Sequence, residues 1–209
     1  MVDQRKSRRW GIFFKLLTFT YIFFALWMFS PNNWMPEKPT DKHTAVVDVE
    51  GMIAASQDAS ADIIVSGLRD AFESKQVAGI ILRINSPGGS PVQSGFVFNE
   101  ILRLREKHPE INVYAAITDM GASGAYYIAA AAEEIYADPA SIVGSIGVIS
   151  SGFGFSDVMD KIGIDRRVMS SGNNKAMLDP FSPVKKEEVE KFQILLGVVH
   201  QQFIDSVRK

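Results

Sequence analysis

Stretches of nearly continuous apolar sequence alternate along this chain with stretches that have helical spacing. The segments 45–51 ("AVVDVEG"), 77–85 ("VAGIILRIN") and 112–118 ("NVYAAIT") are rich in β-branched residues, and the last two are typical of strands buried on both faces. Between them, residues 60–74 and 92–107 carry apolar side chains at helical spacing. This alternation predicts an α/β fold with a largely parallel sheet.

Shorter elements are expected after the third strand. A helix should begin at the segment "GASGAYYIA" (121–129), and another near Pro183. Short strands are predicted at residues 135–137, 145–149 and 164–169.

The first 44 residues have a different character. Residues 10–29 are almost wholly apolar, with Lys15 as their one charged residue, and are long enough to cross the roughly 30 Å hydrocarbon core of a bilayer. Basic residues within 1–9 place the N-terminus in the cytoplasm by the positive-inside rule. Residues 30–44 hold three prolines and lack the Ala-x-Ala-like site of a cleaved signal peptide.

These patterns predict the organisation of the chain. We expect a basic cytoplasmic N-terminus (1–9), one transmembrane anchor (10–29), a linker (30–44) and a globular domain (45–209) outside the cytoplasmic membrane. The sequence ends inside an amphipathic helix, so we expect the domain to continue beyond Lys209.

Composition excludes several function classes. A formal net charge of -2 provides no field that would attract nucleic acid, and the absence of cysteine excludes disulfides, thiolate zinc sites and a cysteine nucleophile. The glycine-rich segment 143–156 has neither the spacing of a dinucleotide-binding loop nor a Gly-Lys-Ser/Thr sequence. We therefore expect no cofactor and no metal.

Ser123 is the first candidate for a chemical role. It lies among Gly121, Ala122 and Gly124, after a buried strand and at the start of a helix, where backbone N–H groups are free and negative charge is stabilised. Small neighbours would let a substrate carbonyl approach the hydroxyl, which suits a nucleophile. Serine is also a favoured helix cap, so this alternative stays open.

A second glycine loop follows the preceding strand. In "NSPGG" (85–89), Gly88 and Gly89 could turn a backbone N–H group toward a cleft, as an oxyanion hole requires. The loop stands at the carboxyl end of a buried strand, where open α/β sheets place their sites. A plain turn is the alternative, because Pro-Gly-Gly forms turns in many settings.

A nucleophilic serine needs a base, and the three histidines are poorly placed for it. His43 is in the linker, while His108 and His200 occupy polar surroundings on helices. Lys175 differs from most other lysines because it lies in a glycine- and asparagine-rich loop and is followed by apolar residues. Such surroundings can favour a neutral amine that acts as a base. A solvated surface lysine remains the alternative.

Four motifs together resemble the signal peptide peptidase A family. They are "NSPGG" (85–89), "GASGAYYIA" (121–129), "GSIGVI" (144–149) and "SGNNKAMLDPF" (171–181). The members of this family are membrane-bound bacterial serine endopeptidases. The resemblance therefore implies this activity, and a fold of repeated ββα units similar to that of ClpP and the crotonases.

The resemblance also implies a role for each candidate residue. Ser123 would be the nucleophile, Lys175 the general base, Ser145 the residue that orients the lysine, and Gly88 or Gly89 an oxyanion donor. It further implies a homo-oligomer in which neighbouring subunits share each active site. The substrates would be released signal peptides or other short hydrophobic peptides, met at the outer, periplasmic side of the membrane.

Three alternatives to this function stay open. A Ser-Lys protease that cleaves a stomatin-like membrane partner would use related chemistry, and a crotonase-like enzyme of CoA thioesters would share the fold. A non-catalytic membrane scaffold would tolerate the loss of Ser123 or Lys175.

Overall fold

The computed structural model describes residues 3–28 and 41–209. The chain divides into two units, Met1–Thr40 and Asp41–Lys209. In the first unit, helix α1 runs from Asp3 to Met28, and the large apolar side chains described between Phe13 and Met28 are exposed. In the part of the chain that the structure describes, no helix is both long and apolar enough to cross a membrane. The transmembrane helix expected at residues 10–29 therefore stays a prediction, and most of the linker predicted at 30–44 lies outside the described residues.

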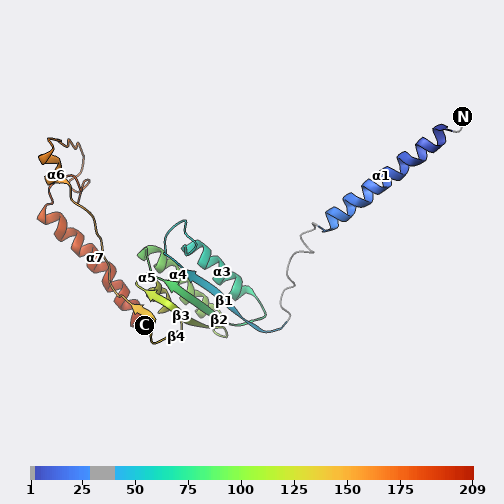
Figure 1. Cartoon of the computed structure of the whole chain (residues 1–209). Coiled ribbons are helices and arrows are strands. Elements are labelled where there is room, and N and C mark those ends of the chain that lie inside the picture. The colour runs from blue at the N-terminus through green and yellow to red at the C-terminus, as the bar shows by residue number, and fades with distance from the viewer. Residues whose placement is uncertain (1–2, 29–40) are drawn as a thin grey trace. The chain divides into compact units, whose positions relative to one another are not determined.

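The second unit is an α/β domain with a parallel sheet, as the sequence predicts. Strands β1 (His43–Glu50), β2 (Val77–Ser86), β3 (Asn112–Ala122) and β4 (Glu134–Ala137) lie in this order, and the short β5 (Ile142–Gly144) pairs with β3. Every pairing is parallel. The connections between the first strands contain helices α3 (Ala61–Glu73), α4 (Pro91–Lys107) and α5 (Gly124–Ala129), and these helices lie along the sheet (Figure 1).

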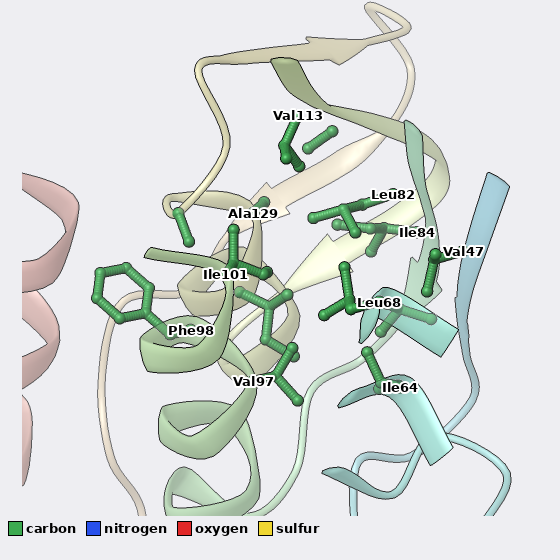
Figure 2. Close-up of a cluster of buried hydrophobic side chains, with 14 of the residues drawn as sticks. Val47, Ile64, Leu68, Leu82, Ile84, Val97, Phe98, Ile101, Val113 and Ala129 are labelled. Carbon is green, nitrogen blue, oxygen red and sulfur yellow. The ribbon is translucent and has the colours of Figure 1, made fainter. Parts of the chain in front are cut away.

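The core forms between these helices and one face of the sheet. Alternate residues of the strands, including Leu82, Ile84 and Val113, are fully buried in one cluster with Leu68 of α3 and Ile101 of α4 (Figure 2). Burial of this much apolar surface is the main stabilising contribution to such a domain. It holds the carboxyl ends of β2 and β3 in fixed positions, where the candidate residues lie.

The last third of the chain differs from the prediction. The strand expected at 145–149 is wrong in position, because the pairing with β3 uses Ile142–Gly144 and the left-handed backbone of Gly144 and Ser145 then turns the chain out of the sheet. No strand forms at 164–169, where the side chains are exposed. The chain instead forms the short helix α6 (Ser156–Lys161) and the long helix α7 (Lys186–Val207).

Candidate active site

Ser123 occupies the junction between β3 and α5 in a strained backbone conformation. Its φ is 52° and its ψ is -122°, a region of backbone conformation that residues other than glycine rarely adopt. Such a conformation costs on the order of 1–3 kcal/mol and persists only where the surrounding structure enforces it. The Ser123 N–H donates to the Gly144 carbonyl at 2.8 Å, which ties the junction to β5.

Ser123 stands at the N-cap position of α5, but its side chain does not cap the helix. A capping serine has extended backbone angles and accepts a hydrogen bond from an N–H of the first helical turn. Ser123 has neither feature, since its φ is positive and its side chain makes no cap hydrogen bond. A strained strand-to-helix turn that presents an uncommitted hydroxyl is the geometry of a nucleophile elbow.

The Gly88–Gly89 loop packs directly against this serine. A Cβ atom on Gly88, whose φ is +91°, would lie 2.6 Å from the Gly124 nitrogen and 2.8 Å from Ser123 Cβ. The structure therefore requires glycine at position 88 so that the loop can approach Ser123. The loop is also held from its other side, because Ile53 N–H donates to the Gly88 carbonyl at 2.9 Å.

The two glycines of the loop differ in their N–H groups. Gly88 N–H donates to Ser86 Oγ at 3.1 Å, whereas Gly89 N–H has no partner among the described residues. Gly89 N lies 3.3 Å from the point where Gly124 would carry a Cβ, so its N–H is next to the first turn of α5. Gly124 comes directly after Ser123, and its N–H belongs to that first turn, where helix N–H groups lack intrahelical partners. The geometry thus favours Gly89 and Gly124 as the pair of oxyanion donors.

Gly124 is a candidate donor that the sequence alone did not single out. A signal for it was present, because the residue after the nucleophile commonly supplies an oxyanion N–H in strand-to-helix elbows.

A small pocket adjoins Ser123. Its volume is about 30 Å³, and helix α7 closes one side of it. Tyr127 lines it, and the Tyr127 hydroxyl accepts a hydrogen bond from Ser206 Oγ at 3.0 Å, while the centroid of its ring lies 5.0 Å from that of Phe203. The full lining is mostly apolar or small: Gly89, Pro91, Ser94, Ser123, Gly124, Tyr127, Gly147, Val148, Val199, Gln202 and Phe203.

Ser145 is next in the chain to a residue that hydrogen-bonds Ser123. It follows Gly144, whose carbonyl accepts the Ser123 N–H, and its own φ is 53°. Its side chain is exposed. The pairing of β5 with β3 is what brings "GSIG" beside the serine segment.

Lys175 is not brought to Ser123 within this chain. It is exposed and is absent from the lining of the Ser123 pocket. Its loop is attached to the beginning of α7, because Asn174 Oδ1 accepts from Lys191 Nζ at 3.2 Å. The pocket contacts the other end of the same helix at Gln202, and about 17 Å of helix separates Lys191 from Gln202 at 1.5 Å per residue.

The lysine loop has its own supporting contacts. Leu178, with a φ of 56°, donates its N–H to the buried carboxylate of Glu188 at 3.1 Å. Asp179 accepts from Ser182 Oγ at 2.8 Å and pairs with Arg166 at 2.9 Å. The hydrogen bond from Ser182 is the main cause that lowers the pKa of Asp179, and the Arg166 guanidinium adds to it. These contacts give the lysine loop a defined shape although it lies apart from the serine.

Comparison with known proteins gives one matching family. The profile of Peptidase family S49 matches residues 105–209, a region that contains Ser123, Ser145 and Lys175. Gly88 and Gly89 precede the matched region.

Similar curated proteins come from distant organisms. The chain is 46% identical over 142 residues to the Na(+)/H(+) antiporter NhaA of Brucella melitensis, which is 68% of this chain and 19% of that protein. It is 36% identical over 147 residues to the chloroplastic serine protease SPPA of Arabidopsis thaliana, covering 70% and 21%. It is 33% identical over 169 residues to Protease 4 of Haemophilus influenzae, covering 79% and 27%. The chain thus spans less than a third of each of these three proteins.

Proposed function

Since the chain belongs to peptidase family S49, the family of signal peptide peptidase A, we propose that it is a serine endopeptidase with Ser123 as its nucleophile. The observation that carries the proposal is the strained turn at Ser123, whose side chain makes no capping bond and whose backbone packs against the Gly88–Gly89 loop. A merely structural serine would not need this conformation.

The proposed reaction proceeds through an acyl-enzyme. Ser123 Oγ forms a bond to the peptide carbonyl carbon while its proton passes to a neutral lysine amine, and the carbonyl oxygen becomes an anion. The Gly89 and Gly124 N–H groups donate to that oxyanion. The tetrahedral intermediate then collapses, the C–N bond breaks, and the lysine returns the proton to the leaving amine. Water then attacks the resulting ester while the lysine amine takes its proton. The ester C–O bond breaks, and the lysine returns the proton to Ser123 Oγ.

We propose that the base is Lys175 of a neighbouring subunit. Two observations support this arrangement: the lysine loop is attached to the beginning of α7, and the Ser123 pocket contacts the end of the same helix. Ser145, which follows the carbonyl that accepts the Ser123 N–H, would then hydrogen-bond the incoming amine. Large apolar side chains exposed along α7, such as Ile194, Leu195 and Val198, would be covered in such an assembly.

The proposed substrates are short hydrophobic peptides, including released signal peptides, at the outer face of a membrane. The apolar lining from Tyr127, Val148, Val199 and Phe203 supports apolar side chains beside the scissile bond. The apolar sequence of residues 10–29 and the exposed apolar side chains of α1 support attachment of the chain to the membrane.

A serine-directed fluorophosphonate tests this function in the full-length protein. We expect the probe to label the wild type but not Ser123→Ala. Hydrolysis of a fluorogenic Leu-Ala peptide should fall at least about 10³-fold in Ser123→Ala and in Lys175→Ala. Lys175→Arg should also fail, because a guanidinium stays protonated. Ser94→Ala serves as the matched control, since Ser94 lines the same pocket and its loss should leave the label in place. Labelling that survives in Ser123→Ala would exclude this serine as the nucleophile.

A further inference from the structure

The sheet ends at β1 in a strand with one unpaired side. β1 pairs only with β2 within the described residues. His43 N–H donates to the Gln76 carbonyl at 2.9 Å and Gly51 N–H to the Asn85 carbonyl at 3.0 Å, so odd-numbered residues direct their amides toward β2. In a parallel strand the N–H and C=O of one residue point to the same neighbour. The even-numbered residues from Thr44 to Glu50 therefore present their backbone groups to the open edge, where a further strand can pair.

A groove runs along this edge between β1 and α3. It encloses about 540 Å³, against about 30 Å³ for the pocket beside Ser123, so it has room for several residues of a bound peptide. Buried apolar residues of both elements, such as Val47, Ile64 and Ala71, lie at its base. The lining consists of His43, Ala45, Val46, Val47, Asp48, Glu50, Asp58, Ile63, Ile64, Gly67, Asp70, Ala71, Ser74 and Val77.

The charge of the groove has one sign. Four carboxylates line it and neither lysine nor arginine does. Asp48 pairs with Arg83 of the neighbouring strand at 2.6 Å. Glu50, Asp58 and Asp70 form no ion pair with the described part of the chain. A bound segment with positive side chains would therefore be attracted, whereas an acidic one would be repelled.

The groove connects directly to the candidate active site. The chain leaving β1 reaches Ile53, which bridges to Gly89, and the Ser90 N–H donates to the Ile53 carbonyl at 2.7 Å. β3, which ends beside Ser123, is two strands away from β1, or about 10 Å across the sheet. A strand added outside β1 would lie three strand spacings, or about 14 Å, from β3. An extended peptide of ten residues spans about 33 Å, so four residues can pair with β1 while the other six, about 20 Å long, reach Ser123.

We propose that this groove binds the basic segment of a peptide substrate, which adds a strand to the open edge of β1. The inference rests on the proposed peptidase function, and it assigns recognition to a surface outside the Ser123 pocket. A signal peptide carries a positively charged segment followed by an apolar segment of about 7–15 residues. The basic segment would pair with β1, and the apolar segment would extend to Ser123. Backbone pairing supplies affinity in this mode of recognition, and side-chain contacts supply selectivity.

Peptide binding to the full-length Ser123→Ala protein tests the proposal without turnover. The probes are two fluorescein-labelled peptides with the same Leu-Ala tail, one beginning with three lysines and the other with three glutamates. We expect the lysine peptide to bind at least about 10-fold more tightly at low salt, with the difference shrinking as salt screens the charges. Adding Asp58→Asn and Asp70→Asn should weaken the binding of the lysine peptide about 5- to 30-fold, so that its affinity comes close to that of the glutamate peptide.

Two further variants separate the groove from a general charge effect. Asp62→Asn is the matched control, because Asp62 is exposed on the same helix α3 but does not line the groove, and it should leave the binding of the lysine peptide unchanged. Val46→Pro removes one N–H from the open edge and none from the pairing with β2, so it should weaken both peptides. Circular dichroism would confirm that this variant is folded.

Equal affinity of the two peptides, or unchanged binding in the Asp58→Asn/Asp70→Asn variant, would overturn the proposal. The outcome is independent of the proposed reaction. If the wild type hydrolyses peptides but the two probe peptides bind equally, the groove proposal fails and the peptidase function stands. If the lysine peptide binds more tightly but the wild type hydrolyses nothing, the peptidase function fails and the groove proposal stands.

Discussion

Individual residues of the site could be predicted from sequence where their chemistry depends on immediate neighbours. Ser123 was recognisable because small residues surround it at the start of a helix, and Gly88 because two glycines follow a buried strand. The backbone strain at Ser123 and the hydrogen bond from Gly88 N–H to Ser86 Oγ depend on how β2, β3 and β5 meet. Only the structure therefore favours Gly89 over Gly88 as the candidate oxyanion donor.

Ser145 carries a prediction at the residue scale. If its hydroxyl fixes the lysine amine beside Ser123, Ser145→Ala should lower kcat/KM about 10- to 100-fold, because one hydrogen bond contributes about 1–3 kcal/mol. Fluorophosphonate labelling of Ser123 should remain detectable, and the thermal unfolding of the protein should be unchanged. Steady-state hydrolysis of a Leu-Ala peptide measures the effect.

Ser151→Ala is a suitable comparison for this experiment. Ser151 is exposed in the same segment and does not line the Ser123 pocket, so its loss should leave the rate unchanged. A Ser145→Ala enzyme as fast as the wild type would make Ser145 an ordinary turn residue.

At the scale of elements, the first four strands and the helices between them follow from periodicity. Most apolar residues of β1, β2 and β3 lie on the buried face of the sheet, so the pattern determines the element, whereas the residues of the short β4 are exposed. The pattern fails after β5, because the aliphatic residues around 145–149 and 164–169 occur without a neighbouring strand to pair with. β-propensity describes fit to a sheet and cannot create the missing partner.

Glu100 of α4 gives a prediction on how the helices are held together. Its carboxylate is buried and pairs with Arg69 of α3 at 2.7 Å and with Arg103 at 2.7 Å. The hydrogen bond from Arg103 is the largest cause that lowers the pKa of Glu100 from 4.5 to about 2, with Arg69 adding to it. Because the folded pKa lies below the unfolded one, this carboxylate stabilises the fold above pH 4.5, and the stabilisation is lost as the pH falls toward 2.

Glu100→Gln should therefore lower the free energy of unfolding by about 1–3 kcal/mol at neutral pH and flatten its decrease between pH 4.5 and pH 2. Urea unfolding of the full-length chain at several pH values measures both effects. Glu190→Gln breaks an exposed pair with Lys186 and should change little, since exposed ion pairs contribute little to stability. A Glu100→Gln variant that keeps the wild-type pH dependence would contradict the assignment.

At the scale of the whole molecule, the sequence indicates Ser123 and Lys175 as catalytic candidates but does not show how far apart they lie. Which lysine meets Ser123 depends on tertiary and quaternary packing, which leaves no local pattern in the sequence. The structure attaches the lysine loop to one end of α7, through Glu188 and Lys191, and the serine pocket to the other end, through Gln202. Within one subunit the lysine and the serine therefore belong to separate regions, and the proposed assembly is what would bring them together.

Co-expression of two inactive variants tests this assembly. Ser123→Ala subunits keep the lysine and Lys175→Ala subunits keep the serine, so a site shared between neighbours regains both groups wherever the two variants meet in the right order. Random mixing of equal amounts should restore about a quarter of the sites, because each required residue is present in half of the subunits. The restored fraction is measured as peptide hydrolysis and as fluorophosphonate labelling of the Lys175→Ala subunit, with each variant alone as a baseline. The matched control replaces Lys175→Ala by the double variant Ser123→Ala/Lys175→Ala, which supplies no serine and should restore nothing. If the mixed oligomers stay as inactive as their parents, each site draws its serine and its base from the same subunit, and the separation along α7 would have to close by a conformational change within one chain.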